Sequence, residues 1–350
     1  MFKNFLNIKY PIIQSPMAGG ITCPQFVAQI SNIGALGFIA AGLLPPKKIQ
    51  NDIENVRSLT DKPFGVNFFV FKDGITIEAD TINETISWLQ PIYDKFGIKF
   101  IRPYQWGQSY QDQFAAIIEM NPEIVSFTFG IPSKQKINLL KEKKIKIMGT
   151  ATTYEEVLKL QQSGVDAIIL QGIEAGGHRG SFLNNSLQNQ LPLIDLLKKA
   201  KDATKLPLIA AGGISTADDM FKLRSLGANM FQIGTVFLCS HEAGTHKNYK
   251  QALKLFKDRP TKLTRLFSGK IARAVVNNWI MDNIKYENKV PNYPFMRTLI
   301  QDLIRYATEN NNPEYMCLFA GKSFDKIKED SAENILLELI DNYSKLNENQ

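Results

Sequence analysis

The sequence predicts a (β/α)8 barrel, a fold in which eight parallel strands alternate with helices. Short apolar runs that end in Gly, Asn or Gln recur between residues 11 and 235, and most are followed by a helical stretch. An open doubly wound sheet would carry a GxGxxG fingerprint after its first strand, and Gly19-Gly20 does not extend to that pattern. The eight predicted strands are residues 11–17, 35–42, 64–70, 124–130, 145–151, 167–171, 206–214 and 230–235.

Helix signals follow several of these strands. Thr22-Cys23-Pro24 opens a helix to about residue 33, and Pro45-Pro46 precedes one to about residue 59. A further helix begins at Thr153, and Glu156 then stands at the N3 position of a capping box.

The regular alternation is interrupted after the third strand. Residues 71–121 contain Trp88 and Trp106 and are too long for an ordinary connection, so we predict a partly helical insertion that could cover a site. The predicted barrel therefore comprises residues 1–70 and 122–245.

The remaining chain, residues 246–350, is predicted to be mostly helical. Amphipathic patterns indicate helices at 295–307 and 331–343. An apolar segment at 315–323 lies between them, and one interpretation is that the chain returns to the barrel there.

Composition is typical of a soluble globular protein, because 44% of the 350 residues are apolar and 21% are charged. The net charge of +7 is spread along the chain without interleaved aromatics, which predicts no nucleic-acid interface and only a modest preference for anionic ligands. No apolar stretch reaches the ~18 residues of a membrane span, and Asn4, Asn7 and Lys9 interrupt any signal-peptide core. We therefore expect a cytoplasmic protein.

Cysteine and histidine spacing predicts no metal site. Cys23, Cys239 and Cys317 are far apart and never form a CxxC pair, which is typical of reduced thiols. His241 and His246 are five residues apart, whereas an HExxH zinc motif needs four to bring both onto one helix face.

The loop after the sixth predicted strand is the best candidate for chemistry. It contains Gly176, Gly177 and Gly180, which allow close approach of a ligand to the backbone, and His178, which can exchange a proton near neutral pH. The competing interpretation is that His178 is an ordinary surface residue. Glu174 in the same loop is either a second acid/base group or a carboxylate that orients its neighbours by accepting N–H bonds.

The loops after the last two predicted strands indicate a phosphate site. In barrels of this class, phosphate commonly lies between the loops after strands seven and eight. Here these loops offer the backbone N–H groups of Gly213 and Gly234 and the hydroxyl of Thr235, which together predict an anion nest. The alternative is that the glycines merely end strands.

Two amides at strand ends extend this interpretation. Asn67 and Gln171 can hydrogen-bond the edge of a heterocycle, which a flavin offers and a simple sugar phosphate does not. Together with the phosphate nest and a Gly-rich first loop after Met17, these amides point to FMN.

Several ordered motifs closely resemble those of the nitronate monooxygenases, formerly called 2-nitropropane dioxygenases. The resemblance covers residues 11 to about 245 strongly and the helical remainder more loosely. It rests on Pro11-Ile12-Ile13-Gln14-Ser15-Pro16-Met17-Ala18-Gly19, Gln171-Gly172-Ile173-Glu174-Ala175-Gly176-Gly177-His178-Arg179-Gly180, Ala210-Ala211-Gly212-Gly213-Ile214 and Gln232-Ile233-Gly234-Thr235.

The resemblance implies an FMN-dependent barrel that oxidises alkyl nitronates with O2 to a carbonyl compound and nitrite. Its expected partners are a small nitronate or nitroalkane and O2, and a homodimer is left open. Carried over by motif, His178 would be the catalytic residue, Met17 and Ala18 would lie against the flavin, and FMN would be held by Asn67, Gln171, Gly176, Gly213, Gln232, Ile233, Gly234 and Thr235.

Other functions remain as alternatives. The FMN-containing enoyl-ACP reductases share the fold and a similar Glu-Ala-Gly-Gly-His segment, but there it follows an acidic residue and glycine, so Gln171-Gly172 favours the monooxygenase. Ser15 departs from the family pattern, in which a small residue such as Ala is common. A flavin-binding protein without turnover and a flavin-free barrel acting on a sugar phosphate are alternatives of other classes.

Overall fold

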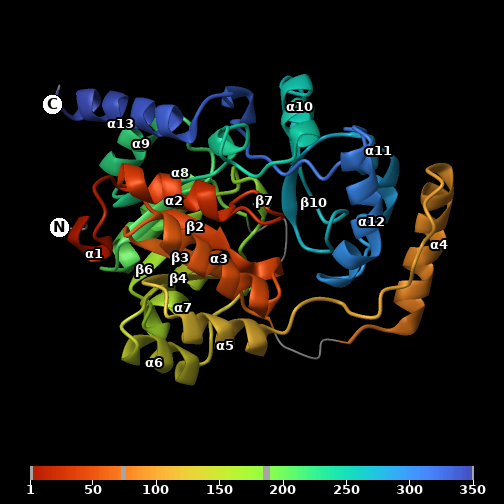
Figure 1. Ribbon diagram of the computed structural model, residues 1–350, viewed down its shortest axis with the longest axis horizontal. Coiled ribbons are helices and arrows are strands. Elements are labelled where there is room, and N and C mark those ends of the chain that lie inside the picture. The colour runs from red at the N-terminus through yellow and green to blue at the C-terminus, as the bar shows by residue number, and fades with distance from the viewer. Residues whose placement is uncertain (1–2, 72–75, 184–189, 349–350) are drawn as a thin grey trace.

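The computed structural model describes residues 3–71, 76–183 and 190–348, and eight parallel strands form its main sheet (Figure 1). A bridge between Ile13 and Leu36 joins the first and last strands of the sheet order, and Gln14 N donates to Leu36 O at 2.9 Å. The sheet therefore closes on itself, which confirms the predicted (β/α)8 barrel. Its strands are β1 (Ile12–Gln14), β2 (Gly37–Ala40), β3 (Phe64–Phe69), β4 (Ile124–Thr128), β5 (Lys146–Ala151), β6 (Ala167–Gln171), β8 (Leu208–Ala211) and β9 (Met230–Ile233).

Eight helices surround this barrel, and the eighth comes from the far end of the described chain. Helix α13 (Ala332–Glu348) packs between α9 and α2, where the helix after the last barrel strand belongs. Of the predicted insertion at 71–121, α5 packs against α3 and β3 as a barrel helix. The other barrel helices are α2 (Pro24–Ile33), α3 (Pro46–Leu59), α5 (Tyr110–Met120), α6 (Lys134–Glu142), α7 (Tyr154–Ser163), α8 (Leu193–Ala203) and α9 (Ala217–Ser225), and a short α1 (Lys3–Leu6) precedes them.

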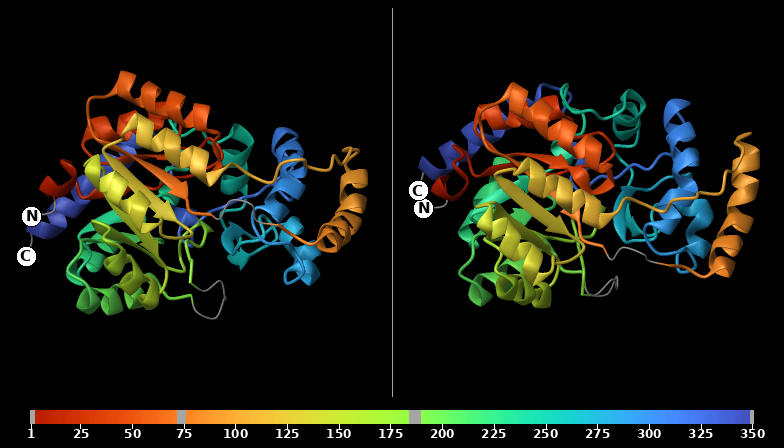
Figure 2. Two further views of the ribbon diagram at one scale, coloured as in Figure 1. Left: turned by 90° about the horizontal axis from the view of Figure 1, so that it is seen from below. Right: turned by 60° about the horizontal axis from the view of Figure 1, so that its bottom comes forward.

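Two excursions from the barrel, residues 76–109 and 238–331, pack on each other and form a second lobe that we call the cap. Tyr93 Oη donates to Leu299 O at 2.7 Å, and the ring of Trp88 stacks on that of Tyr286 at 4.4 Å. In Figure 2 the blue cap helices lie between the barrel and α4. The cap contains α4 (Ala79–Lys95), α10 (Lys247–Leu255), α11 (Asn278–Asn283), η4 (Ile284–Tyr286), α12 (Phe295–Glu309) and η5 (Phe324–Lys326), and η3 (Thr235–Phe237) leads into it.

The cap also holds a small antiparallel sheet that the sequence did not predict. Strands β10 (Thr261–Thr264) and β11 (Ala272–Val275) form a hairpin, and β7 (Gly177–His178) from the barrel loop pairs with β11. Both hairpin strands are only four residues long, too short to show clear alternation. The part of the barrel loop that carries His178 therefore forms an edge strand of the cap sheet.

The capping box predicted at α7 is only half formed. Thr153 Oγ1 accepts from Glu156 N at 3.3 Å, as expected. The Glu156 carboxylate instead accepts from Thr152 N at 2.7 Å and from Phe182 N at 2.5 Å, so it joins the barrel to the loop after β7. No helix in the described part of the chain combines the length and apolar character needed to span a membrane.

The position of α13 in the barrel predicts a large stability effect of truncating its inner face. Leu336 is fully buried, so Leu336→Ala should lower the free energy of unfolding by about 2–5 kcal/mol. Its neighbour Leu337 is only partly buried, and Leu337→Ala on the same helix should cost less than half as much. Denaturant titration of both variants measures this, and equal small losses would mean that α13 is not part of the barrel core.

Candidate active site

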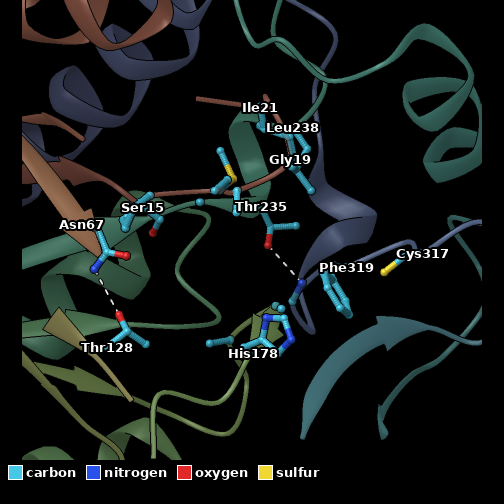
Figure 3. A pocket seen from close by; sticks show the side chains of 18 of the residues that line it. Ser15, Gly19, Ile21, Asn67, Thr128, His178, Thr235, Leu238, Cys317 and Phe319 are labelled. Carbon is cyan, nitrogen blue, oxygen red and sulfur yellow. Dashed lines mark hydrogen bonds between the residues drawn. The ribbon is translucent and has the colours of Figure 1, made fainter. Parts of the chain in front are cut away.

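A cavity of about 500 Å³ lies at the carboxyl ends of the barrel strands, against the cap. Barrel side chains such as Ser15, Asn67 and Thr235 form one side, and Phe319 and Cys317 of the cap form the other (Figure 3). Ile233 does not line it, because its side chain is buried in the barrel core. The other sequence-predicted residues all line the cavity: Met17, Ala18, Asn67, Gln171, Gly176, His178, Gly213, Gln232, Gly234 and Thr235.

His178 faces this cavity and is not an ordinary surface residue. Its Nε2 lies 2.7 Å from Ser268 Oγ of the cap, and the aromatic rings of Phe129, Tyr293 and Phe319 surround it with centroid distances of 5.2–5.8 Å. Nδ1 has no hydrogen-bond partner among the described residues and stays available to a ligand.

The surroundings of His178 keep its ring neutral. Burial lowers the pKa of His178 from 6.5 to about 3, and the positive charges of Lys270 and Arg297 act in the same direction. An imidazole with such a pKa accepts a proton weakly and donates or accepts hydrogen bonds as a neutral group.

Gln171 positions the His178 loop. Its Nε2 donates to His178 O at 3.0 Å, and its Oε1 accepts from Gly180 N at 2.8 Å. The predicted role, hydrogen bonding to a heterocycle, is therefore limited to the one hydrogen and one lone pair that remain on this amide. The main observed function of Gln171 is to hold the backbone on either side of Arg179.

Three buried cations hold the carbonyl groups of the same loop. Arg179 donates to Gln171 O at 2.6 Å and to Gly172 O, and burial lowers its pKa to about 10. Arg273 donates twice to Ile173 O, at 2.8 and 2.9 Å. Lys270 donates to Ser181 O at 2.9 Å, and burial lowers its pKa to about 8.

Glu174 orients the backbone instead of facing the cavity. Its carboxylate accepts from Leu193 N at 3.0 Å, at the start of α8, and it does not line the cavity wall. Of the two interpretations of Glu174, the geometry favours the orienting one.

The backbone amides of the predicted anion nest lie at the ends of β8 and β9. No described residue accepts a hydrogen bond from the amides of Gly213, Gly234 or Thr235. Thr235 Oγ1 accepts from Gly321 N at 3.0 Å (Figure 3), which leaves its own hydrogen free to donate. These donors suit a phosphate group.

The segment 320–323 completes this nest from the cap side. Ser323 Oγ donates to Gly213 O at 3.1 Å. A Cβ on Gly176 would lie 2.5 Å from backbone atoms of Ala320 and Gly321, so only glycine allows the segment to pass this close to the His178 loop.

Two amide oxygens on the barrel side are left for a ligand. Asn67 Nδ2 donates to Thr128 Oγ1 at 3.1 Å (Figure 3) and to Ser126 Oγ at 2.8 Å. Its Oδ1 has no partner among the described residues. Gln232 Oε1 is buried and also lacks a partner in the described part of the chain. A buried acceptor without a donor is costly, so Gln232 fits a site that is completed by a bound group with N–H donors.

The sequence pattern missed the cap residues of the site. These residues carry no local signal, because Ser268, Tyr293 and Phe319 contact His178 only through the packing of the cap. Arg297 likewise lines the cavity only because the cap folds onto the barrel. The apolar segment 315–323 was the single indication in the sequence that this part of the chain approaches the barrel.

Comparison with known proteins decides the family. The family model described as "Nitronate monooxygenase" matches residues 1–342. The chain belongs to the nitronate monooxygenase family. It is accordingly an oxidoreductase of this family, and the resemblance seen in the motifs is confirmed.

Nitronate monooxygenase relatives cover nearly the whole chain. A probable nitronate monooxygenase of Bacillus subtilis (strain 168) is 36% identical over 96% of both chains. One of Staphylococcus saprophyticus is 38% identical over 91% of this chain and 90% of its own.

Solved structures show the same architecture. Nitroalkane oxidase from Streptomyces ansochromogenes superposes with a TM-score of 0.91 at 31% identity, covering 99% of each chain. FabK from Thermotoga maritima gives a TM-score of 0.77 at 25% identity, covering 99% of this chain and 97% of its own.

The neutral state of His178 predicts a specific pH dependence of stability. Between the pKa of about 3 in the folded protein and the ordinary 6.5, the unfolded chain binds a proton that the folded protein does not. The stability of wild type relative to His178→Asn should therefore fall by about 2 kcal/mol from pH 8 to pH 5. Denaturant titrations at each pH measure it, and His241 and His246 cancel because both proteins contain them. A constant difference would mean that His178 titrates normally in the folded state.

Proposed function

We propose that this protein oxidises alkyl nitronates with O2, giving a carbonyl compound and nitrite, and that it uses FMN. The observation that carries the proposal is that one cavity combines backbone amides with the buried Gln232 Oε1, none of which has a partner among the described residues. A group with both a phosphate and a ring edge bearing N–H donors satisfies these two features at once.

The cavity residues fit FMN in particular. Gly213, Gly234 and Thr235 would hold its phosphate, and Gln232 and Asn67 would accept hydrogen bonds from its ring edge. FMN, when bound, supplies the two-electron oxidation of the substrate and passes the electrons to O2. A phosphate dianion fits the nest without a salt bridge, since backbone N–H groups and a hydroxyl suffice as donors.

His178 would act on the substrate as a neutral group. Its low pKa makes it a weak base, so removal of the α proton from a neutral nitroalkane is disfavoured. A nitronate has already lost that proton and needs only binding and orientation. Ser268 and the surrounding rings fix the imidazole for that task. We therefore propose that nitronates are preferred over nitroalkanes.

The enoyl-ACP reductase alternative has weaker support. The structural match to FabK has a lower TM-score and lower identity than the match to nitroalkane oxidase. Gln171, which holds the His178 loop here, also stands where the reductase segment follows an acidic residue.

The first test separates these two reactions. The purified protein should carry flavin that a small alkyl nitronate reduces anaerobically, whereas NADH or NADPH should leave it oxidised over the same time, because a substrate that supplies the electrons makes a nicotinamide unnecessary. In air, the nitronate should produce oxygen uptake and nitrite together. Rapid bleaching by a nicotinamide, with no nitrite from any nitronate, would favour the reductase.

The second test examines the proposed FMN contacts. Thr235→Val removes a hydroxyl donor to the phosphate and should weaken FMN binding about 10-fold or more. Gln232→Leu should also weaken FMN binding, but it should stabilise the apo-protein because it removes a buried acceptor without a partner. Flavin titration and thermal unfolding of the apo-proteins measure both effects. Full flavin retention by both variants would rule out this placement of FMN.

A further inference from the structure

The charged side chains that line the cavity are all positive. Among the described residues that line it there is no Asp or Glu, whereas two arginines, Arg297 and Arg305, do line it. An anion that leaves water for such a cavity is stabilised by hydrogen-bond donors or by a counter-ion, and away from the backbone amides proposed to hold the phosphate a cationic side chain can supply both. The cations near the cavity differ in whether their side chains are free to contact an anionic substrate.

Most nearby cations are already engaged. Arg179 and Arg273 donate to carbonyls of the His178 loop and do not line the cavity. Lys270 does not line the cavity either; it donates to Ser181 O and its Nζ lies 4.5 Å from the centroid of the Phe129 ring. These three cations affect the site only through their field.

Arg305 is at the solvent side of the cavity. Its side chain is 67% exposed, and its Nη2 lies 2.9 Å from Asp302 Oδ1 on the preceding turn of α12. Water and this ion pair screen its charge.

Arg297 differs from all of these. It is half-buried on α12, two turns before Arg305, and the helix face that lines the cavity runs from Arg297 through Ile300, Gln301 and Ile304 to Arg305 and Thr308. Arg297 forms no hydrogen bond or ion pair with any described residue. Arg297 lines the same cavity as His178 and Cys317, and its charge acts on both of these residues and on Tyr293.

The chemistry of the substrate matches this side chain. A nitronate group is planar, and its negative charge is shared by two oxygens. The guanidinium group is a planar fork of N–H donors that pairs with two oxygens of an anion at once, which an ammonium group does not do. We infer that Arg297 is the counter-ion that binds the nitronate group and makes the site selective for the anion over the neutral nitroalkane. This inference rests on the function proposed above.

The experiment compares three variants of the flavin-loaded enzyme. Arg297→Gln should raise the KM for a small alkyl nitronate roughly 30-fold or more, with a smaller change in kcat and less than about threefold change in KM for the corresponding nitroalkane. Arg297→Lys should give an intermediate KM, because it keeps the charge and loses the fork. Arg305→Gln, the control on the same helix face, should change the KM less than about threefold.

Nitrate provides a readout that does not depend on turnover. It is a planar oxyanion of similar size, and calorimetry should show that it binds the wild-type holoenzyme and that Arg297→Gln raises its Kd by a similar factor. Flavin content and the thermal midpoint of each variant verify that it is folded and loaded.

Each outcome has one meaning. Equal effects of Arg297→Gln and Arg305→Gln would overturn the inference. They would show that the positive charges act on the substrate through long-range electrostatics and not through a direct contact with Arg297. An unchanged nitrate Kd in Arg297→Gln, or no nitrate binding by a wild type that oxidises nitronates, would overturn it as well. Nitrate binding that depends on Arg297, in a protein that oxidises no nitronate, would support the anion site and refute the proposed reaction.

Discussion

The pairing of β7 with β11 is the constraint on which the rest of the active site depends. By sequence, β7 belongs to the barrel loop after β6, yet its register pairs His178 with Ala272 of the cap hairpin. Arg179 N also donates to Ile271 O at 2.8 Å. The backbone of the histidine is therefore fixed by the cap on one side and by Gln171 of the barrel on the other. The site exists only when the two lobes are docked.

The way in which this loop is held also determines the electrostatics of the cavity. Arg179, Lys270 and Arg273 are held by neutral carbonyl groups, which satisfy their N–H donors without cancelling their charge. Glu156 and Glu174 offset part of this positive field, but no described carboxylate lines the cavity itself. The three cations thus orient the loop and favour an anionic ligand, and Lys270 adds to the burial that keeps His178 neutral.

The features that the sequence could predict were those formed by residues close to one another along the chain. Each barrel strand is an apolar run with a polar or glycine end, so the strands, His178 and the Gly213 to Thr235 nest were visible locally. Ser268 and Arg297 were not, because they lie 90 and 119 residues after His178 and approach it only through the folded cap. The hydrogen bonds that Gln171 makes to the His178 loop were not predicted, because their partners, His178 O and Gly180 N, are backbone atoms and a residue pattern does not reveal them.

The place of α13 in the ring gives the chain a particular order of assembly. Barrel helices α9 and α2 stay without their neighbour until the entire cap excursion at 238–331 has been synthesised, because α13 follows it. Until then, the apolar surface that faces Leu336 is exposed to water and to other chains. Contacts that join residues from opposite ends of a chain also form slowly, since a long loop must be closed first. Newly made chains of this protein therefore pass through a period in which the barrel is open along one seam, between α9 and α2.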